Sequence, residues 1–134
     1  MKKLLLLLSI ILALFLIFMG VQKFLGANPV FSYLAETTGF ALFEPVIRIL
    51  TGVMEIIAAL LLLWPTKRKY GALLAAAIIG GALVFHLSPF LGINAPVAFA
   101  PDGSYVKSSM LFFMAIGSFV VALAVISLDR KSRE

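Results

Sequence analysis

Hydrophobic residues form four long runs along the chain, separated by short polar segments. Each run is close to the roughly 20 residues that cross a bilayer as a helix. The expected spans cover about 4–26, 45–64, 70–90 and 108–128. Because backbone polar groups must be satisfied within the membrane, such runs are helical. The pattern predicts one all-α domain, residues 1–134, built as an integral membrane four-helix bundle.

The first run has a second interpretation as a secretory signal peptide, since Lys2 and Lys3 precede a Leu-rich stretch. The apolar core of a signal peptide is about 7–15 residues long, and this run is longer. Only a weak small-residue pattern, Gly26-Ala27, follows it. We therefore expect a retained helix.

The segment between the first two runs carries helix signals of its own. Asn28 is a good N-cap and Pro29 suits the first helical position, while Gly39 is a plausible stop. The aromatic residues between them are too apolar for a free loop. We expect a short helix in the membrane interface, with an ordinary loop as the alternative.

Small residues dominate the first half of the third run. Two sets recur at four-residue spacing, and such spacing lets helix backbones approach closely. They are Ala72, Ala76 and Gly80, and Ala77 with Gly81. This pattern predicts that the third spanning helix is the packed centre of the bundle.

Composition supports a membrane protein and excludes several chemistries. The chain is 63% hydrophobic and 13% charged, with a mean hydropathy of +1.14; soluble domains are roughly 45–50% apolar. The absence of cysteine excludes disulfides and thiolate ligands, and a single histidine excludes a bis-His haem within one chain. We expect no metal site and no intrinsic cofactor.

The basic residues carry topology information. The net charge is +5, but the basic residues cluster beside the apolar runs, so we expect a lipid bilayer and no nucleic acid as the partner. With four spans both termini share one side. Eight of the eleven basic residues fall on that side, which the positive-inside rule places in the cytoplasm: Lys2, Lys3, Lys67, Arg68, Lys69, Arg130, Lys131 and Arg133.

Ionisable residues within the spans are the candidate site. Such residues are costly in a bilayer and are functional candidates by default. Glu44, Arg48, Thr51 and Glu55 form a polar stripe on one helix face, with Glu55 about 10 Å deeper than Arg48. Lys23 and His86 are the remaining ligand or proton-handling candidates. Each lies at the end of its own helix, on the same side of the membrane as Arg48.

Each candidate also has a purely structural interpretation. Glu55 can lock two helices together, and Arg48 can be its counter-ion or an interfacial anchor. Lys23 can extend its ammonium to the outer headgroups, and His86 can be a hydrogen bonder at a helix end. A carboxyl poised between neutral and ionised states can instead carry protons or bind a carbonyl ligand such as a quinone.

Several short motifs follow one another along the chain. The first span ends in Gly20-Val21-Gln22-Lys23, and the second contains Gly52-Val53-Met54-Glu55. His86-Leu87, Leu91-Gly92-Ile93 and Asp102-Gly103 come after them. This ordered set resembles the DoxX and DoxX-like family of small four-helix membrane proteins, whose first two motifs are Gly-x-x-Lys and Gly-x-x-Glu, and it adds Asp102 as a loop candidate. The chain departs from the family in its longer 91–107 connector and in Ser104-Tyr105.

The resemblance implies a prokaryotic cytoplasmic membrane and, by likeness to some members, a subunit of a quinone-linked oxidoreductase. Three hypotheses remain open, and they leave enzymatic activity undecided. The chain can bind a quinone, receiving electrons from a redox partner subunit. It can bind or transport a small lipophilic or anionic solute. It can be a structural or assembly subunit without a ligand. A homo-oligomer is the alternative to a partner subunit.

Overall fold

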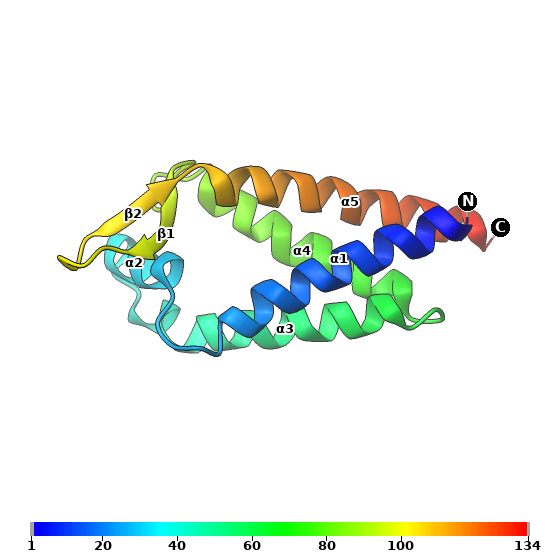
Figure 1. The fold of residues 1–134 in the computed structure, drawn as a ribbon, viewed down its shortest axis with the longest axis horizontal. Helices are drawn as coiled ribbons and strands as arrows, with labels where there is room; N and C mark the ends of the chain where they lie inside the picture. Colours follow the sequence, from blue (N-terminus) through cyan, green and yellow to red (C-terminus); the bar gives the residue numbers. More distant parts are fainter. Residues whose placement is uncertain (1, 134) are drawn as a thin grey trace.

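Four long helices form the body of the molecule in the computed structural model, which describes residues 2–133 (Figure 1). They are α1 (Lys2–Gln22), α3 (Val46–Leu63), α4 (Arg68–His86) and α5 (Met110–Ser132). All four are long and apolar enough to cross a membrane. Each packs on two neighbours, in the order α1–α3–α4–α5 and back to α1. The predicted all-α bundle is confirmed.

The two ends of the bundle differ in character. The basic end holds the start of α1, the α3–α4 turn and the end of α5, and both chain termini lie there (Figure 1). The capped end holds the short helix α2 (Pro29–Thr38), the 3₁₀ turn η1 (Ala41–Phe43), and the strands β1 (Ala95–Phe99) and β2 (Tyr105–Ser108). The short helix, the 3₁₀ turn and the two strands thus all cover the same end of the bundle.

Helix α2 confirms the short helix expected between the first two spans. The Asn28 Oδ1 atom accepts from Val30 N at 3.0 Å, and Pro29 follows as the first helical residue. Gly39 ends the helix with a φ of 76°, the left-handed conformation in which glycine has no Cβ penalty. Leu34 points from α2 into a small apolar cluster that also contains Phe43 and Leu91.

The long connector before α5 folds into an antiparallel hairpin, which the sequence did not reveal. Ala95 pairs with Ser108 and Phe99 with Tyr105, with a bulge between Pro96 and Ala98. Gly103 makes the turn at a φ of 88°. Two contacts tie β2 to α2: Tyr105 Oη donates to Glu36 Oε1 at 2.9 Å, and Lys107 Nζ donates to Tyr33 Oη at 3.1 Å.

The backbones approach most closely at two glycine contacts. At the basic end, a Cβ added to Gly71 would lie 2.6 Å from Leu62 N, so α4 presses directly on α3. Towards the capped end, a Cβ added to Gly52 would lie 3.1 Å from the carbonyl oxygen of Gly20, so α3 presses on α1. The expectation that α4 is the packed centre is wrong: α4 is one side of a ring.

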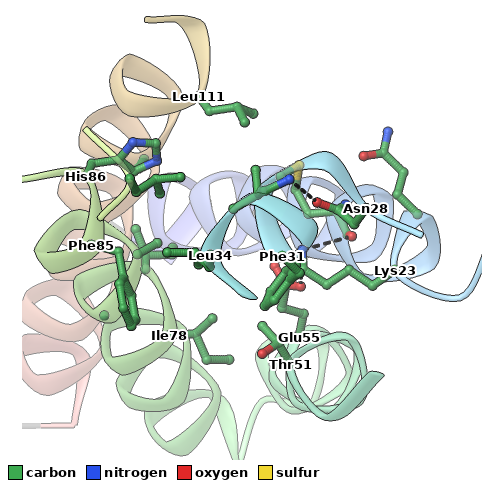
Figure 2. Close-up of a pocket in the computed structure, with 18 of the residues that line it drawn as sticks. Lys23, Asn28, Phe31, Leu34, Thr51, Glu55, Ile78, Phe85, His86 and Leu111 are labelled. Atoms are coloured by element: carbon green, nitrogen blue, oxygen red, sulfur yellow. Dashed lines mark hydrogen bonds and ion pairs between the residues drawn. The ribbon is translucent and has the colours of Figure 1, made fainter. Parts of the chain in front are cut away.

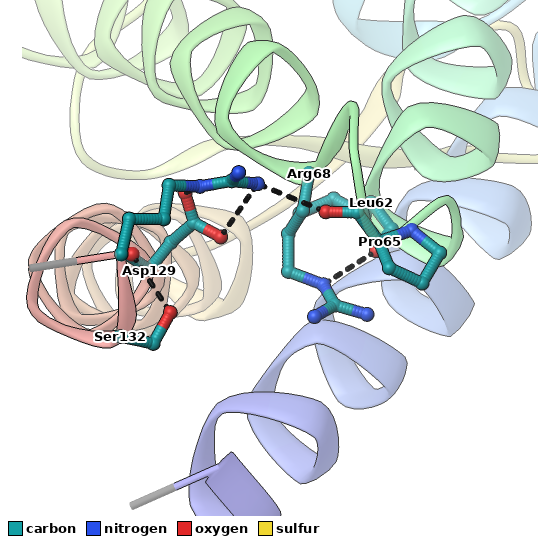
Figure 3. A network of polar contacts seen from close by, with 6 residues as sticks. Leu62, Pro65, Arg68, Asp129 and Ser132 are labelled. Carbon is teal, nitrogen blue, oxygen red and sulfur yellow. Dashed lines mark hydrogen bonds and ion pairs between the residues drawn. The ribbon is translucent and has the colours of Figure 1, made fainter.

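Helix α5 continues to Ser132, beyond the expected end of the last span at 128. Asp129 is only 3% exposed and lies in α5. Its carboxylate accepts from Arg133 Nε at 3.0 Å, and Arg133 Nη2 also donates to the Pro65 carbonyl at 3.0 Å (Figure 3). Arg68 Nε donates to the Leu62 carbonyl beside them. The bond from Arg133 to Pro65 joins the end of α5 to the α3–α4 turn.

Candidate functional site

The two Gly-x-x-charge motifs of the sequence face each other across the α1–α3 contact. Gly20 and Gly52 let the two antiparallel backbones meet. Lys23 and Glu55 each follow their glycine by three residues. A Cβ on Gly52 would lie 3.0 Å from the Cβ of Lys23, so the lysine side chain passes over the bare glycine backbone. The glycines therefore give Lys23 its route to Glu55.

Lys23 and Glu55 form an ion pair within the bundle. Nζ of Lys23 lies 2.7 Å from Oε1 of Glu55, and the two side chains are 8% and 6% exposed. Apart from Lys23, Glu55 Oε1 has no polar partner among the described residues. Lys23 Nζ also donates to the Met19 carbonyl at 3.2 Å. The alternative in which Lys23 extends to the outer headgroups is wrong, because its buried ammonium turns back along α1 to the Met19 carbonyl and to Glu55.

Arg48 is not the counter-ion of Glu55. Its Nε lies 2.5 Å from Oε1 of Glu44, one turn earlier on the same helix, and its Nη1 donates to the Lys23 carbonyl. Glu44 Oε2 in turn accepts from the backbone N–H of Asn28 at 3.1 Å. Arg48 therefore anchors the chain that leaves α1, and it holds the backbone of Lys23 in place.

A cavity of about 370 Å³ lies beside the ion pair. Residues from all four spanning helices line it, together with α2, β1 and the segment before β1. Most of the lining is apolar, for example Phe15, Phe31 and Ile78. Its ionisable lining residues within the described chain are Lys23, Glu55 and His86. Figure 2 shows the ion pair on one side and His86 across from it.

His86 has a defined tautomer. Its Nδ1 lies 3.0 Å from the Gly92 carbonyl oxygen. Because a carbonyl only accepts, Nδ1 must carry the proton of this hydrogen bond, which leaves Nε2 as an acceptor in the neutral ring. The side chain is 5% exposed and packs 5.8 Å from the Phe112 ring. Thus His86 is a hydrogen bonder at a helix end and also a wall of the cavity.

Small residues on α4 open the cavity instead of closing it. Nothing lies within 4 Å of a Cβ added to Gly81, and both Gly81 and Ala77 line the cavity. The prediction that this pair packs against another helix is wrong at these two positions, whereas Ala72 and Ala75, nearer the basic end, are fully buried. The α3–α4 contact at Gly71 lies at the basic end, and no such contact closes the helices near Gly81.

Asp102 lies outside the cavity, in the hairpin turn. Its Oδ1 accepts from the Ser104 backbone at 3.0 Å and from the Ser104 hydroxyl at 2.6 Å. These hydrogen bonds hold the pKa of the Asp102 carboxyl below its usual value. Asp102 thereby stabilises the turn, and the structure gives it no contact with Lys23, Glu55 or His86.

Four polar lining residues were not candidates from the sequence: Gln22, Asn28, Thr51 and Ser118. Two of them carried a signal, since Thr51 belonged to the polar stripe of its helix and Asn28 was the expected N-cap. Gln22 directly precedes Lys23, which is the only hint of its position. Ser118 had no signal, because an isolated serine in an apolar run is common in spanning helices.

Comparison with known proteins gives the family. No curated protein and no solved structure matches the chain. The family model described as methylamine utilisation protein MauE matches residues 1–96, a range that includes Lys23, Arg48, Glu55 and His86. MauE proteins are a small four-span membrane family related to DoxX. The predicted resemblance to DoxX is therefore confirmed as a relationship between the two families, and the family matched is MauE. The chain is a multi-pass membrane protein that belongs to the MauE family.

Proposed function

We propose that this chain is a membrane subunit that binds a quinone-type ligand in the cavity beside Lys23 and Glu55. The family name links MauE proteins to methylamine utilisation, and we propose that the chain serves the same process. The observation that carries the proposal is the combination of a large apolar cavity with ionisable groups on opposite walls (Figure 2). Apolar pockets of roughly 300–1,000 Å³ with a few convergent polar groups are typical ligand sites.

The residues present fit a quinone head group. An aromatic and aliphatic lining suits its ring, and the two carbonyl oxygens need donors. The Lys23 ammonium is a donor on one wall, and a protonated His86 Nε2 is a donor on the other. Glu55 Oε1 keeps acceptor capacity beyond its ion pair, because a carboxylate accepts up to about four hydrogen bonds. It can therefore take up or release a proton beside the ligand.

The bound group would supply redox chemistry: a quinone takes up two electrons and two protons to become a quinol. Glu55, ionised beside Lys23, would take up a proton from water and pass it to the ligand oxygen near it, and His86 would do the same through Nε2 for the other oxygen. Lys23 would polarise the oxygen nearest to it. The proposal requires a redox-active partner subunit as the source of electrons. The chain has no cysteine to hold an iron–sulfur cluster and only one histidine, so it cannot hold a bis-His haem.

The cavity distinguishes this proposal from the two alternatives. A structural subunit needs the Lys23–Glu55 pair to fix helix register but has no use for about 370 Å³ of space beside it. A carrier of a small anion needs an uncompensated cation, whereas Glu55 already neutralises Lys23 and Glu44 neutralises Arg48. A larger lipophilic ligand accounts for both features.

We propose that the basic end faces the cytoplasm, as the positive-inside rule indicates. The capped end, with α2 and the hairpin, then faces the opposite side of a bacterial cytoplasmic membrane. The cavity lies nearer this capped end, since α2 and β1 contribute to its lining.

Quinone binding to the purified protein in lipid nanodiscs tests the proposal. We expect saturable binding of a photoreactive benzoquinone, weakened by Glu55→Gln and by His86→Ala. Asp102→Asn is the matched control, because Asp102 lies outside the cavity. Unchanged affinity in both cavity variants would remove the site assignment. No binding by the wild-type chain would remove the proposed function.

A further inference from the structure

A second hollow lies on the flank of the bundle between α1 and α5. Its volume is about 260 Å³. We call it the α1–α5 groove. It is lined by six residues: Ile11, Leu12, Phe15, Met114, Ser118 and Val121.

The groove offers no free hydrogen-bond donor from its side chains. Ser118 is its one polar residue, and its hydroxyl donates to the Met114 carbonyl at 2.8 Å within its own helix. The hydroxyl also lies 3.2 Å from the Ala115 carbonyl. Acceptor atoms on a ligand segment in this groove would find no donor and would stay unsatisfied. The groove therefore suits a chain of carbon and hydrogen only.

The groove adjoins the cavity. Phe15, Met114 and Ser118 line both of them. The groove also reaches the bundle surface, because Ile11 is 49% exposed. Among the described glycines, the close backbone contacts join α1 to α3 and α3 to α4, and Gly117 of α5 has nothing within 4 Å of an added Cβ. No described glycine therefore brings the α1 and α5 backbones together at this flank.

We propose that the α1–α5 groove holds the apolar tail of the ligand whose head group occupies the cavity. The inference rests on the proposed function and narrows its ligand class. The ligand is a membrane lipid with one long hydrocarbon or isoprenoid chain, and not a water-soluble quinone. It enters from the bilayer between α1 and α5, with the head group passing Phe15 and Met114 to reach Lys23 and Glu55.

Tail-length dependence of binding tests this inference. The probes are a benzoquinone with a decyl tail and the same benzoquinone without a tail, each measured in nanodiscs. Val121→Trp fills the groove, and Val121 does not line the cavity. Val120→Trp is the matched control on the lipid-facing side of the same helix, since Val120 is 59% exposed. Ile11→Trp, with Leu14→Trp as its control, repeats the test from α1.

We expect Val121→Trp and Ile11→Trp to weaken binding of the decyl probe by about tenfold or more, because about two buried methylene groups are worth that factor. Binding of the tail-less probe should stay within about twofold. Both controls should behave as the wild type does, and wild-type-to-variant ratios cancel the tail's own partitioning into lipid. A groove variant that unfolds would bind neither probe. The groove variant on the other helix then provides the test.

The outcomes separate the two proposals. Equal affinity of the decyl probe for wild type and both groove variants overturns the tail assignment while leaving the cavity site in place. Loss of both probes in the wild type overturns the proposed function itself. Equal weakening of both probes in folded groove variants also overturns the tail assignment, because the groove would then act on the head group.

Discussion

Removing Lys23 should destabilise the bundle strongly, because it leaves the Glu55 carboxylate without its counter-ion. The pair is separated by 2.7 Å and both side chains are less than a tenth exposed. Breaking a buried pair by deleting one partner costs about 3–5 kcal/mol. Lys23→Met keeps the stem that passes over Gly52 but removes the charge. The stability lost is therefore that of the ion pair and of the hydrogen bond to the Met19 carbonyl, which contributes about 1 kcal/mol.

The reverse deletion should cost less. In Glu55→Met, the Lys23 stem is long and flexible and lies at the end of α1, so its ammonium can turn outward to water. Replacing both residues by methionine removes both charges, and apolar replacement of a buried pair is often neutral or stabilising by about 1–4 kcal/mol. The double variant should therefore be more stable than Lys23→Met alone, with a coupling free energy of at least about 3 kcal/mol.

Reversible unfolding in mixed detergent micelles, followed by far-ultraviolet circular dichroism, measures these free energies. Lys69→Met is the control, because Lys69 is exposed at the basic end and surface changes are usually within about 0.5 kcal/mol. The reasoning is refuted if Lys23→Met costs less than about 1 kcal/mol, or if the double variant loses the sum of the single losses.

Three further predictions concern packing, titration and topology. Gly71→Ala should destabilise by about 1–3 kcal/mol, because its Cβ would meet the Leu62 backbone at 2.6 Å, while Gly117→Ala should not destabilise; thermal unfolding in detergent compares them. Burial and the bond to Glu36 raise the pKa of Tyr105 to about 12. Its stabilising contribution is complete below pH 10 and lost as pH rises through about 12; Glu36→Gln should lower that pKa in an ultraviolet titration. A fluorescent reporter fused to the C-terminus should fluoresce; periplasmic phosphatase activity there would contradict the cytoplasmic assignment.

Local signals in the sequence predicted the elements that depend on neighbouring residues. Apolar run length predicted the four spanning helices. Asn28, Pro29 and Gly39 predicted α2, because caps act within one turn of the helix end. The hairpin was missed because its strands are short and its signal was limited to the Asp102-Gly103 turn. A connector of this composition is compatible with many conformations.

The site depended on tertiary contacts, which the sequence constrained less. Lys23, Arg48 and Glu55 were predicted to lie towards the same end of the bundle, and they do, but helical spacing favoured Arg48 as the neighbour of Glu55. The structure gives that place to Lys23, because Gly20 and Gly52 bring a second helix within reach. Pairing across helices is decided by backbone approach, and spacing along one helix does not report it.

The cavity could not be predicted, because the same pattern can pack or leave space. Ala77 and Gly81 have the four-residue spacing that brings helices together. They line open space because α3 and α4 touch at Gly71, near the other end of α4. The place at which two helices separate depends on all the contacts of the bundle together.

The quinone content of protein purified from membranes in mild detergent tests the central claim most directly. Gly81→Leu adds a side chain where nothing lies within 4 Å of the new Cβ, and it fills the cavity without removing a polar group. Gly117→Leu makes the same change outside the cavity. Extraction and mass spectrometry should find quinone with the wild type and with Gly117→Leu, and about tenfold less or none with Gly81→Leu. Equal quinone in all three, or none in the wild type, would contradict a quinone site in this cavity.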